Sequence, residues 1–137
     1  MKTIDDIKEI KFPIHATNPH DGVLVPVELQ ELIPFEVKRI FYVQGASSPA
    51  KKGKHAHIKT NQVLVCIKGT IECICKDRFG GEISIILSDS TTGIHIPEMI
   101  WDEQIYSSKE SILLSFCSTS YDRRDYIEDW EDFRKCP

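Results

Sequence analysis

The sequence lacks any long run of apolar residues and any excess of positive charge. No stretch of its 137 residues approaches the length of a membrane-spanning helix, and the charged start over residues 1–8 does not resemble a signal peptide. The 17 basic residues are outnumbered by 21 acidic ones, which gives a net charge of −4. Nonspecific electrostatic binding to nucleic acid or to an anionic membrane is therefore not expected. We expect a cytoplasmic protein that binds neither nucleic acid nor a membrane.

The sequence also lacks any Cys-x-x-Cys pair. Its five cysteines are odd in number, and most of them fall inside predicted strands. They are Cys66, Cys73, Cys75, Cys117 and Cys136. We interpret them as reduced thiols that pack as small apolar side chains, and we assign them no chemistry.

Helical spacing is scarce. Only residues 125–135 place apolar side chains at helical intervals, so a short amphipathic C-terminal helix is expected there. Elsewhere, short apolar runs alternate with Gly and Pro signals, as in antiparallel sandwiches and barrels. We predict one all-β domain over residues 1–137, a jelly roll that follows a polar leader over residues 1–20.

Two predicted strands precede the central part of the chain. Residues 22–28 are extended and contain Pro26, which indicates an edge strand or one that crosses to a second subunit. In the next strand, residues 35–43, Arg39 and Phe41 face one side. Tyr42 faces the other side, together with polar residues.

The chain is organised around His55-Ala56-His57. On a strand, two imidazoles that are one residue apart project to the same side. An apolar strand over residues 63–67, a turn and a second strand over residues 71–75 follow. The histidines therefore form a local pair directly ahead of a hairpin.

The spacing around the pair matches the first motif of cupins, which are small double-sheet barrels. His55-Ala56-His57 is followed after four residues by Gln62, in place of the usual Glu, and six residues later by Gly69. The second motif is degraded, with Asp102 in place of its histidine. Two readings remain open: His55, His57 and Asp102 hold a metal as a facial triad, or the imidazoles act as free acids and bases.

With these motifs in place, the chain resembles the nucleotide-sugar 3,4-ketoisomerases of the cupin superfamily over most of its length. The resemblance is carried by Ile33-Pro34-Phe35, Lys38-Arg39-Ile40-Phe41-Tyr42, Gly53-Lys54-His55-Ala56-His57, Gln62-Val63-Leu64-Val65, Gly69, Trp101, Tyr121-Asp122 and Asp125-Tyr126-Ile127. Lys52 and Asp102 depart from the family pattern, which often has arginine and histidine at these positions.

The resemblance implies a jelly-roll homodimer with exchanged N-terminal strands and an active site without metal or cofactor. The implied reaction converts a dTDP-linked 4-keto-6-deoxyglucose to a 3-keto isomer through an enediolate, in the biosynthesis of 3-amino-3,6-dideoxy sugars and the glycans that carry them. We assign the carbon proton to His55, the proton shuttle between the oxygens to His57, and an acid or hydrogen-bonding role to Tyr42.

Substrate binding is assigned to six further residues. We expect cationic side chains to hold the pyrophosphate, a tryptophan to line the sugar pocket, and two polar side chains to complete the site. These residues are Arg39, Lys52, Lys54, Trp101, Gln62 and Asp102.

Three alternatives remain beside the ketoisomerase. They are a dTDP-sugar 3,5-epimerase in the same barrel, a metal-dependent cupin enzyme that uses His55, His57 and Asp102, and a cupin that binds a sugar nucleotide without turnover. The sequence leaves open whether the product has the gluco or the galacto configuration at C4.

Overall fold

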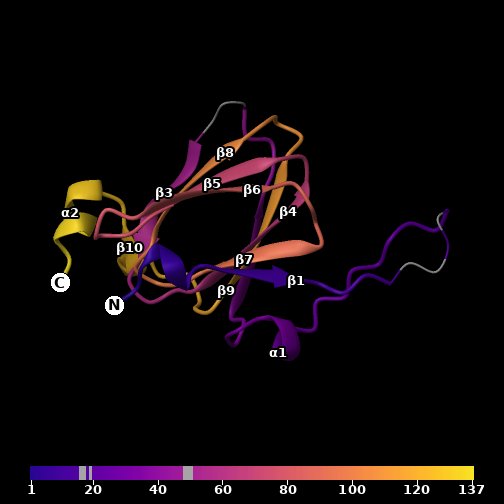
Figure 1. The fold of residues 1–137 in the computed structure, drawn as a ribbon, viewed down its shortest axis with the longest axis horizontal. Helices are drawn as coiled ribbons and strands as arrows, with labels where there is room; N and C mark the ends of the chain where they lie inside the picture. Colours follow the sequence, from indigo (N-terminus) through magenta and orange to yellow (C-terminus); the bar gives the residue numbers. More distant parts are fainter. Residues whose placement is uncertain (16–17, 19, 48–50) are drawn as a thin grey trace.

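Two antiparallel sheets of five strands face each other in the computed structural model, which describes residues 1–15, 18, 20–47 and 51–137 (Figure 1). The first sheet contains, in spatial order, β1 (Lys8–Lys11), β7 (Thr92–Ile96), β4 (Gln62–Lys68), β9 (Ile112–Cys117) and β2 (Arg39–Val43). The second contains β10 (Tyr126–Ile127), β3 (Lys51–His57), β8 (Trp101–Tyr106), β5 (Ile71–Lys76) and β6 (Glu82–Leu87). The all-β, double-sheet prediction is confirmed.

The helical elements within the described residues are short. They are η1 (Ile4–Asp6), α1 (Leu29–Leu32), η2 (Arg123–Asp125) and α2 (Trp130–Lys135). None of them is long and apolar enough to cross a membrane.

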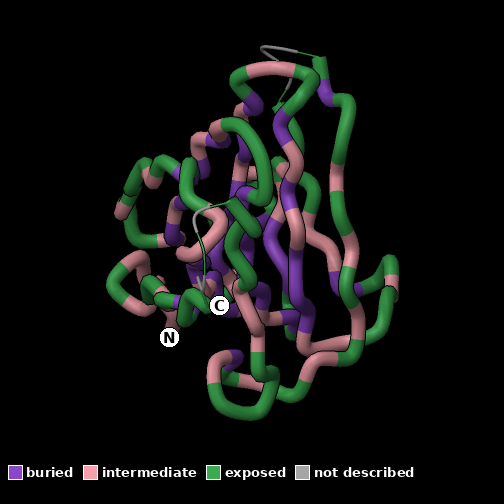
Figure 2. Tube along the Cα trace, turned by 90° about the vertical axis from the view of Figure 1, so that its right-hand side faces the viewer, coloured by how far each residue is buried: buried purple, intermediate pink, exposed green. Residues whose placement is uncertain are grey.

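The main core lies between the two sheets, and the strands carry most of the buried residues (Figure 2). Along β5 the inward residues include Ile71, Cys73 and Cys75, which are fully buried, and they meet Leu64 and Cys66 of β4. All five cysteines carry free thiols, and only Cys136 is not buried. The interpretation of the strand cysteines as buried reduced side chains is confirmed.

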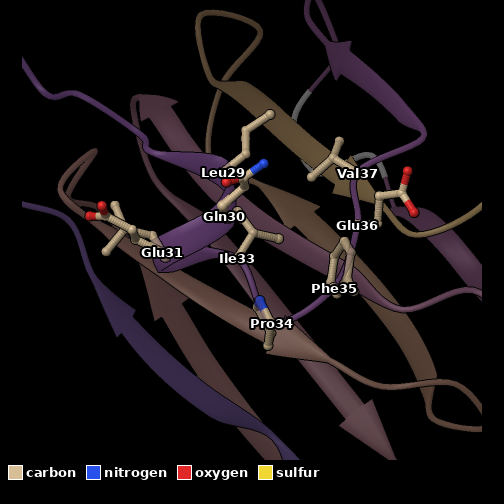
Figure 3. Close-up of a pocket in the computed structure, with 9 residues that line it drawn as sticks. Leu29, Gln30, Glu31, Ile33, Pro34, Phe35, Glu36 and Val37 are labelled. Atoms are coloured by element: carbon tan, nitrogen blue, oxygen red, sulfur yellow. The ribbon is translucent and has the colours of Figure 1, made fainter.

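A second apolar cluster covers the outer face of the first sheet. Val63 and Val65 of β4 pack there with Phe116 of β9, and Phe12 and Ile33 cover them. Residues 29–37, which include α1, cross this face and line a hollow of about 740 Å³ (Figure 3). This hollow lies outside the barrel and contains none of the predicted site residues.

The predicted polar leader is partly structured. Ile10 pairs with Gly93 in the ladder between β1 and β7, and Phe12 is buried directly after β1. The apolar residues Ile10 and Phe12 alternate with charged ones, so the segment serves as an edge strand of the first sheet. In the predicted strand over residues 22–28, only Leu24 forms a bridge, to His15, on the segment that extends away from the sheets (Figure 1). Val25 and Val27 pack against the apolar cluster on the outer face of the first sheet.

The C-terminal helix begins later than predicted. Its N-cap is Asp129, whose side chain accepts a hydrogen bond from the Asp132 amide. Tyr126 and Ile127, which the helical spacing included, instead form β10 and pair with His57 and Ala56. β3 would otherwise be an edge strand of the second sheet. Its backbone N–H and C=O groups find partners in β10, whereas a helix that began at Asp125 would leave them unpaired.

Phe133 carries the packing of α2 against the outer face of the second sheet. It is fully buried, and its ring lies 5.7 Å from that of Trp101 and 5.5 Å from that of Trp130. We expect Phe133→Ala to lower the free energy of unfolding by about 3 to 5 kcal/mol, measured by urea denaturation, because it leaves a cavity. Phe79→Ala is the control, since Phe79 is exposed, and an equal loss in both variants would contradict the assigned packing.

Candidate active site

A bulge in β3 decides which way the histidines face. Gly53 pairs with Glu103 of β8 and His55 pairs with Asp102, so Lys54 is an extra residue in the strand. Gly53 and Lys54 both have positive φ angles, of 77° and 58°. A Cβ atom on residue 53 would lie 2.8 Å from the carbonyl oxygen of Asp102, so only glycine fits here.

The bulge brings Lys52 and His55 to the same face of the sheet. Lys52 lies opposite Gln104 and His55 lies opposite Asp102, and residues directly opposite each other in a ladder share a face. Gln104 and Asp102 alternate with Trp101 and Glu103, and they lie on the same face as Tyr106, which belongs to the core between the sheets. Lys52, His55 and His57 therefore face the barrel interior, with Lys52 at its exposed rim.

The two histidines form a hydrogen-bonded pair. Their Nε2 atoms are 3.1 Å apart, and the Nδ1 atom of His57 lies 2.9 Å from Oδ2 of Asp125. A carboxylate accepts, so the Nδ1 atom of His57 carries the proton and its Nε2 atom is left as an acceptor. His55 then donates from Nε2, and one proton is shared between the two rings.

Asp125 is held as a carboxylate by other donors. The Lys59 amide donates to Oδ1 over 2.7 Å, the Thr60 hydroxyl donates to Oδ2, and Thr60 is itself 2.5 Å from the Thr119 hydroxyl. Burial opposes ionisation, but the hydrogen bonds from Thr60, His57 and Lys59 outweigh it and lower the pKa of Asp125. The hydrogen bond to His57 is therefore made to a charged acceptor.

Both imidazoles are neutral at neutral pH. Burial lowers the pKa of His55 below its usual 6.5, and burial together with the neighbouring His55 lowers the pKa of His57 to about 4. His57 is almost fully buried, whereas His55 is only partly so. His55 is thus the ring of the pair that a bound molecule can reach, and a hydrogen bond with the Gly53 backbone carbonyl partly offsets the effect of burial on its pKa.

Aromatic rings and an arginine surround the pair. The ring of Tyr126 lies 4.9 Å from that of His55 and 4.5 Å from that of His57, and the ring of Tyr121 lies tilted 5.8 Å from that of Tyr126. The guanidinium of Arg39 lies 5.5 Å from the ring of Tyr121, and its charge contributes to the low pKa of His57. The buried Nε atom of Arg39 has no hydrogen-bond partner among the described residues.

Several predicted site residues lie on the interior side with the histidines. Arg39 and Lys52 reach it from β2 and β3. Gln62 is buried at the start of β4, where its amide lies 3.8 Å from the Cys117 thiol. Asp102 is buried on β8 beside His55. Lys54, the bulge residue, is exposed.

The structure places Trp101 outside the barrel. Its ring packs at 5.3 Å against Trp130 of α2, and its indole N–H donates to Glu103. The alternation of β8 sends odd-numbered residues outward, so Trp101 packs under α2 and does not line a sugar pocket within the barrel.

Tyr42 lies away from the histidines within one chain. It is 65% exposed on the outer face of β2, next to Ile40, because even-numbered residues of this strand face outward. The predicted alternation of this strand is confirmed, and that alternation separates Tyr42 from the pair. Tyr126 is the tyrosine that contacts the histidines.

The residues that sequence reasoning missed are Asp125, Thr60 and Tyr126. Asp125 is 68 residues from His57 along the chain, and it was counted as the start of a helix. No spacing rule connects residues so far apart. The sole signal was the presence of Asp125-Tyr126-Ile127 among the segments that carry the resemblance.

The described part of the chain contains no group of three or more His, Cys, Asp or Glu side chains placed to hold a metal ion. His57 has both ring nitrogens engaged in hydrogen bonds. Its geometry is that of a hydrogen-bonded imidazole in a proton-transfer pair.

The pair makes a spectroscopic prediction. In nitrogen-15 NMR spectra we expect His57 to be the Nδ1–H tautomer and to stay neutral until the pH falls towards about 4, because burial disfavours its charged form. In Asp125→Asn the tautomer preference should weaken, and Asp122→Asn, which removes a half-exposed carboxylate paired with Arg124, should leave it unchanged. An Nε2–H tautomer or a titration at the usual 6.5 in the unaltered protein would contradict the arrangement.

Comparison with known proteins gives a consistent result. The chain matches the family model described as "FdtA: WxcM-like, C-terminal" over residues 5–137. It is 35% identical over 115 residues to the TDP-4-oxo-6-deoxy-alpha-D-glucose-3,4-oxoisomerase of Aneurinibacillus thermoaerophilus, which covers 83% of this chain and 81% of that protein.

Solved structures of a sugar 3,4-ketoisomerase share the fold. The enzyme QdtA from Thermoanaerobacterium thermosaccharolyticum, in complex with TDP, superposes with a TM-score of 0.90 at 30% identity and covers 96% of this chain and 93% of that one. A histidine-to-asparagine variant of QdtA in complex with TDP-4-keto-6-deoxyglucose has a TM-score of 0.88 at 30% identity, with 94% and 91% covered. The cupin jelly-roll prediction is confirmed, and the chain belongs to the FdtA family of WxcM-like proteins.

Proposed function

We propose that this protein is a sugar-nucleotide 3,4-ketoisomerase that acts on a dTDP-linked 4-keto-6-deoxy sugar. The observation that carries the proposal is the neutral, partly accessible His55, hydrogen-bonded to His57 inside the barrel. Relatives at 30 to 35% identity are 3,4-ketoisomerases, and one was solved with TDP-4-keto-6-deoxyglucose. An enzyme of this class is an intramolecular oxidoreductase.

The chemistry needs one accessible base and a stabilised enediolate. The C4 ketone acidifies the hydrogen on C3, and His55 removes it. The C3 hydroxyl then loses its proton, the C4 oxygen gains one, and C4 is reprotonated to leave the ketone at C3. The two electrons stay within the sugar, so the reaction consumes no external oxidant or reductant. A positioned base of this kind supplies roughly 10² to 10⁴ in rate.

His57 acts through His55 in this proposal. Its Nδ1–H is committed to Asp125 and its Nε2 atom accepts from His55, so it has no free nitrogen to shuttle protons between the sugar oxygens. The carboxylate and the inner imidazole instead orient the outer imidazole and stabilise its protonated form after C3–H removal.

The nucleotide part of the substrate binds at the cationic rim of the barrel in this proposal. We propose that Lys52, which faces inward at the rim, and Arg39 bind the pyrophosphate, with Lys54 beside them. Gln62 is buried near Arg39 through their shared neighbour Cys117, and we keep it as a polar residue at the floor of the site.

We also propose a homodimer in which the N-terminal segments are exchanged. Ile14, Val23 and Leu24 are large apolar residues that lie exposed on the segment that extends from the barrel, and Ile40 and Tyr42 are exposed on the edge strand β2. In this proposal Tyr42 lies at the interface between the two subunits. Light scattering on the purified protein should give twice the chain mass of 15.7 kDa, and a monomer at micromolar concentration would contradict the dimer.

The activity has a direct test. We expect purified protein treated with a chelator to convert TDP-4-keto-6-deoxyglucose to a 3-keto isomer, followed by proton NMR. His55→Asn should lower the rate by about 10² to 10⁴ because it removes the base. His95→Asn is the control, since His95 lies on the outer face of the first sheet and bonds Asn61.

Three outcomes would contradict this function. Full turnover in His55→Asn would remove the assigned base. Exchange at C3 and C5 with the ketone still at C4 would indicate a 3,5-epimerase. A shift of the melting temperature by the sugar nucleotide without any product would indicate a binding protein.

A further inference from the structure

Asp102 stands apart from the other buried carboxyl groups of the described residues. Its Oδ1 atom is buried and has no hydrogen-bond partner. Its Oδ2 atom accepts from the Gln104 amide over 2.6 Å, and the Gln104 carbonyl accepts from the Tyr106 hydroxyl over 3.1 Å. The three side chains form a polar row along the inner face of β8.

The contrast with Asp77 and Asp125 shows how unusual this is. Asp77 accepts from the backbone amides of Ile4, Phe79 and Gly81, and both oxygens of Asp125 accept hydrogen bonds. An unpartnered oxygen on a buried carboxyl group costs free energy that a neutral residue would avoid. Such a cost is typical of groups that act on a ligand.

Asp102 also holds a proton that it can give up near neutral pH. Burial raises the pKa of its carboxyl group to about 7, so a large share of the molecules carries the neutral acid. The groups that face it are His55 and Lys52 from β3, Cys73 and Cys75 from β5, and Tyr106 from its own strand. The two thiols are neutral because burial raises their pKa.

The histidine pair leaves one step of the reaction without a donor. Because the rings share one proton and His57 is tied to Asp125, the pair takes up one proton at a time. Once His55 holds the C3 hydrogen as an imidazolium, C4 must receive a proton from somewhere. Asp102 lies directly opposite His55 in the ladder, and its buried Oδ1 atom has no hydrogen-bond partner.

We propose that the Asp102 carboxyl group is the second proton carrier of the isomerase and protonates C4 of the enediolate. The proposal rests on the proposed function. The C3–H bond breaks to give the His55 imidazolium, the O–H bond of Asp102 breaks as the new C4–H bond forms, and Asp102 is left as a carboxylate. The imidazolium then loses its proton to solvent and the carboxylate takes one up from solvent, which restores both groups. The hydroxyl proton passes from the C3 oxygen to the C4 oxygen, so charge and protons balance over one turnover.

The test separates removal of the C3 hydrogen from delivery of the C4 hydrogen. TDP-4-keto-6-deoxyglucose is incubated in D₂O with the unaltered protein, with Asp102→Asn and with the control Glu103→Gln. Glu103 is the neighbouring carboxylate, which faces outward beside Trp101. An asparagine keeps the shape and the acceptor for Gln104 but has no acidic proton.

We expect Asp102→Asn to keep exchanging the C3 hydrogen of the substrate for deuterium while product formation falls by about 10² or more. Glu103→Gln should behave as the unaltered protein. Product formed by Asp102→Asn at the unaltered rate would overturn the proposal. Loss of C3 exchange together with product, in a variant whose melting temperature is unchanged, would also overturn it, because Asp102 would then act before protonation.

A measurement on the unaltered protein covers the case in which Asp102→Asn does not fold. Substrate deuterated at C3 is turned over in H₂O, and the product is analysed at C4. With two carriers, the C4 hydrogen comes from Asp102 and the product carries no deuterium there. Deuterium carried from C3 to C4 would mean that one base does both steps, which overturns the assignment. If the unaltered protein neither exchanges C3 nor forms product, it is the proposed function that fails.

Discussion

The hydrogen bond between His57 and Asp125 fixes the protons of the whole site. Asp125 is charged because a hydroxyl, a backbone amide and an imidazole donate to it, and its charge in turn fixes the His57 tautomer. The acceptor thus created on His57 orients His55, and burial keeps His55 neutral. The chain segments around β3, η2 and the loop after His57 all converge on this one carboxylate, and this makes the C-terminal part of the chain essential to a site that lies in the middle of the sequence.

The bulge at Gly53 and Lys54 is the second constraint. It shifts the register of β3 by one residue, and the side chains on the two sides of it, Lys52 and His55, come to share the inner face. Without the bulge, a cation at the rim and a base within the barrel would lie on opposite faces. The same shift sets His55 opposite Asp102, and the missing side chain of Gly53 makes room for the backbone of that residue.

Much of this arrangement was predictable because it depends on local patterns. A two-residue period places His55 and His57 on one side and separates Tyr42 from Arg39. Apolar strands with cysteines at alternate positions predict buried thiols. The structure confirms the alternation and the burial of these thiols. Asp125 was not predictable, since it lies in η2, its partner His57 lies 68 residues away on β3, and no periodicity relates them. Trp101 was predicted to line the sugar pocket, whereas the structure places it under α2. Polar and apolar residues occur on both faces of β8, so the sequence of this strand has no alternation that would have indicated the direction of Trp101.

The central claim is that a neutral imidazole, His55, is the base, and the pH dependence of kcat/KM tests it most directly. The account predicts a bell-shaped profile for the chelator-treated protein. Activity should fall as the pH drops below the usual 6.5 of histidine, since burial lowers the pKa of His55, and should fall again above about 7 as Asp102 loses its proton. A rate that keeps rising as the pH falls further below 6.5, with no loss on the acid side, would mean that a protonated histidine carries the reaction, and would contradict the account.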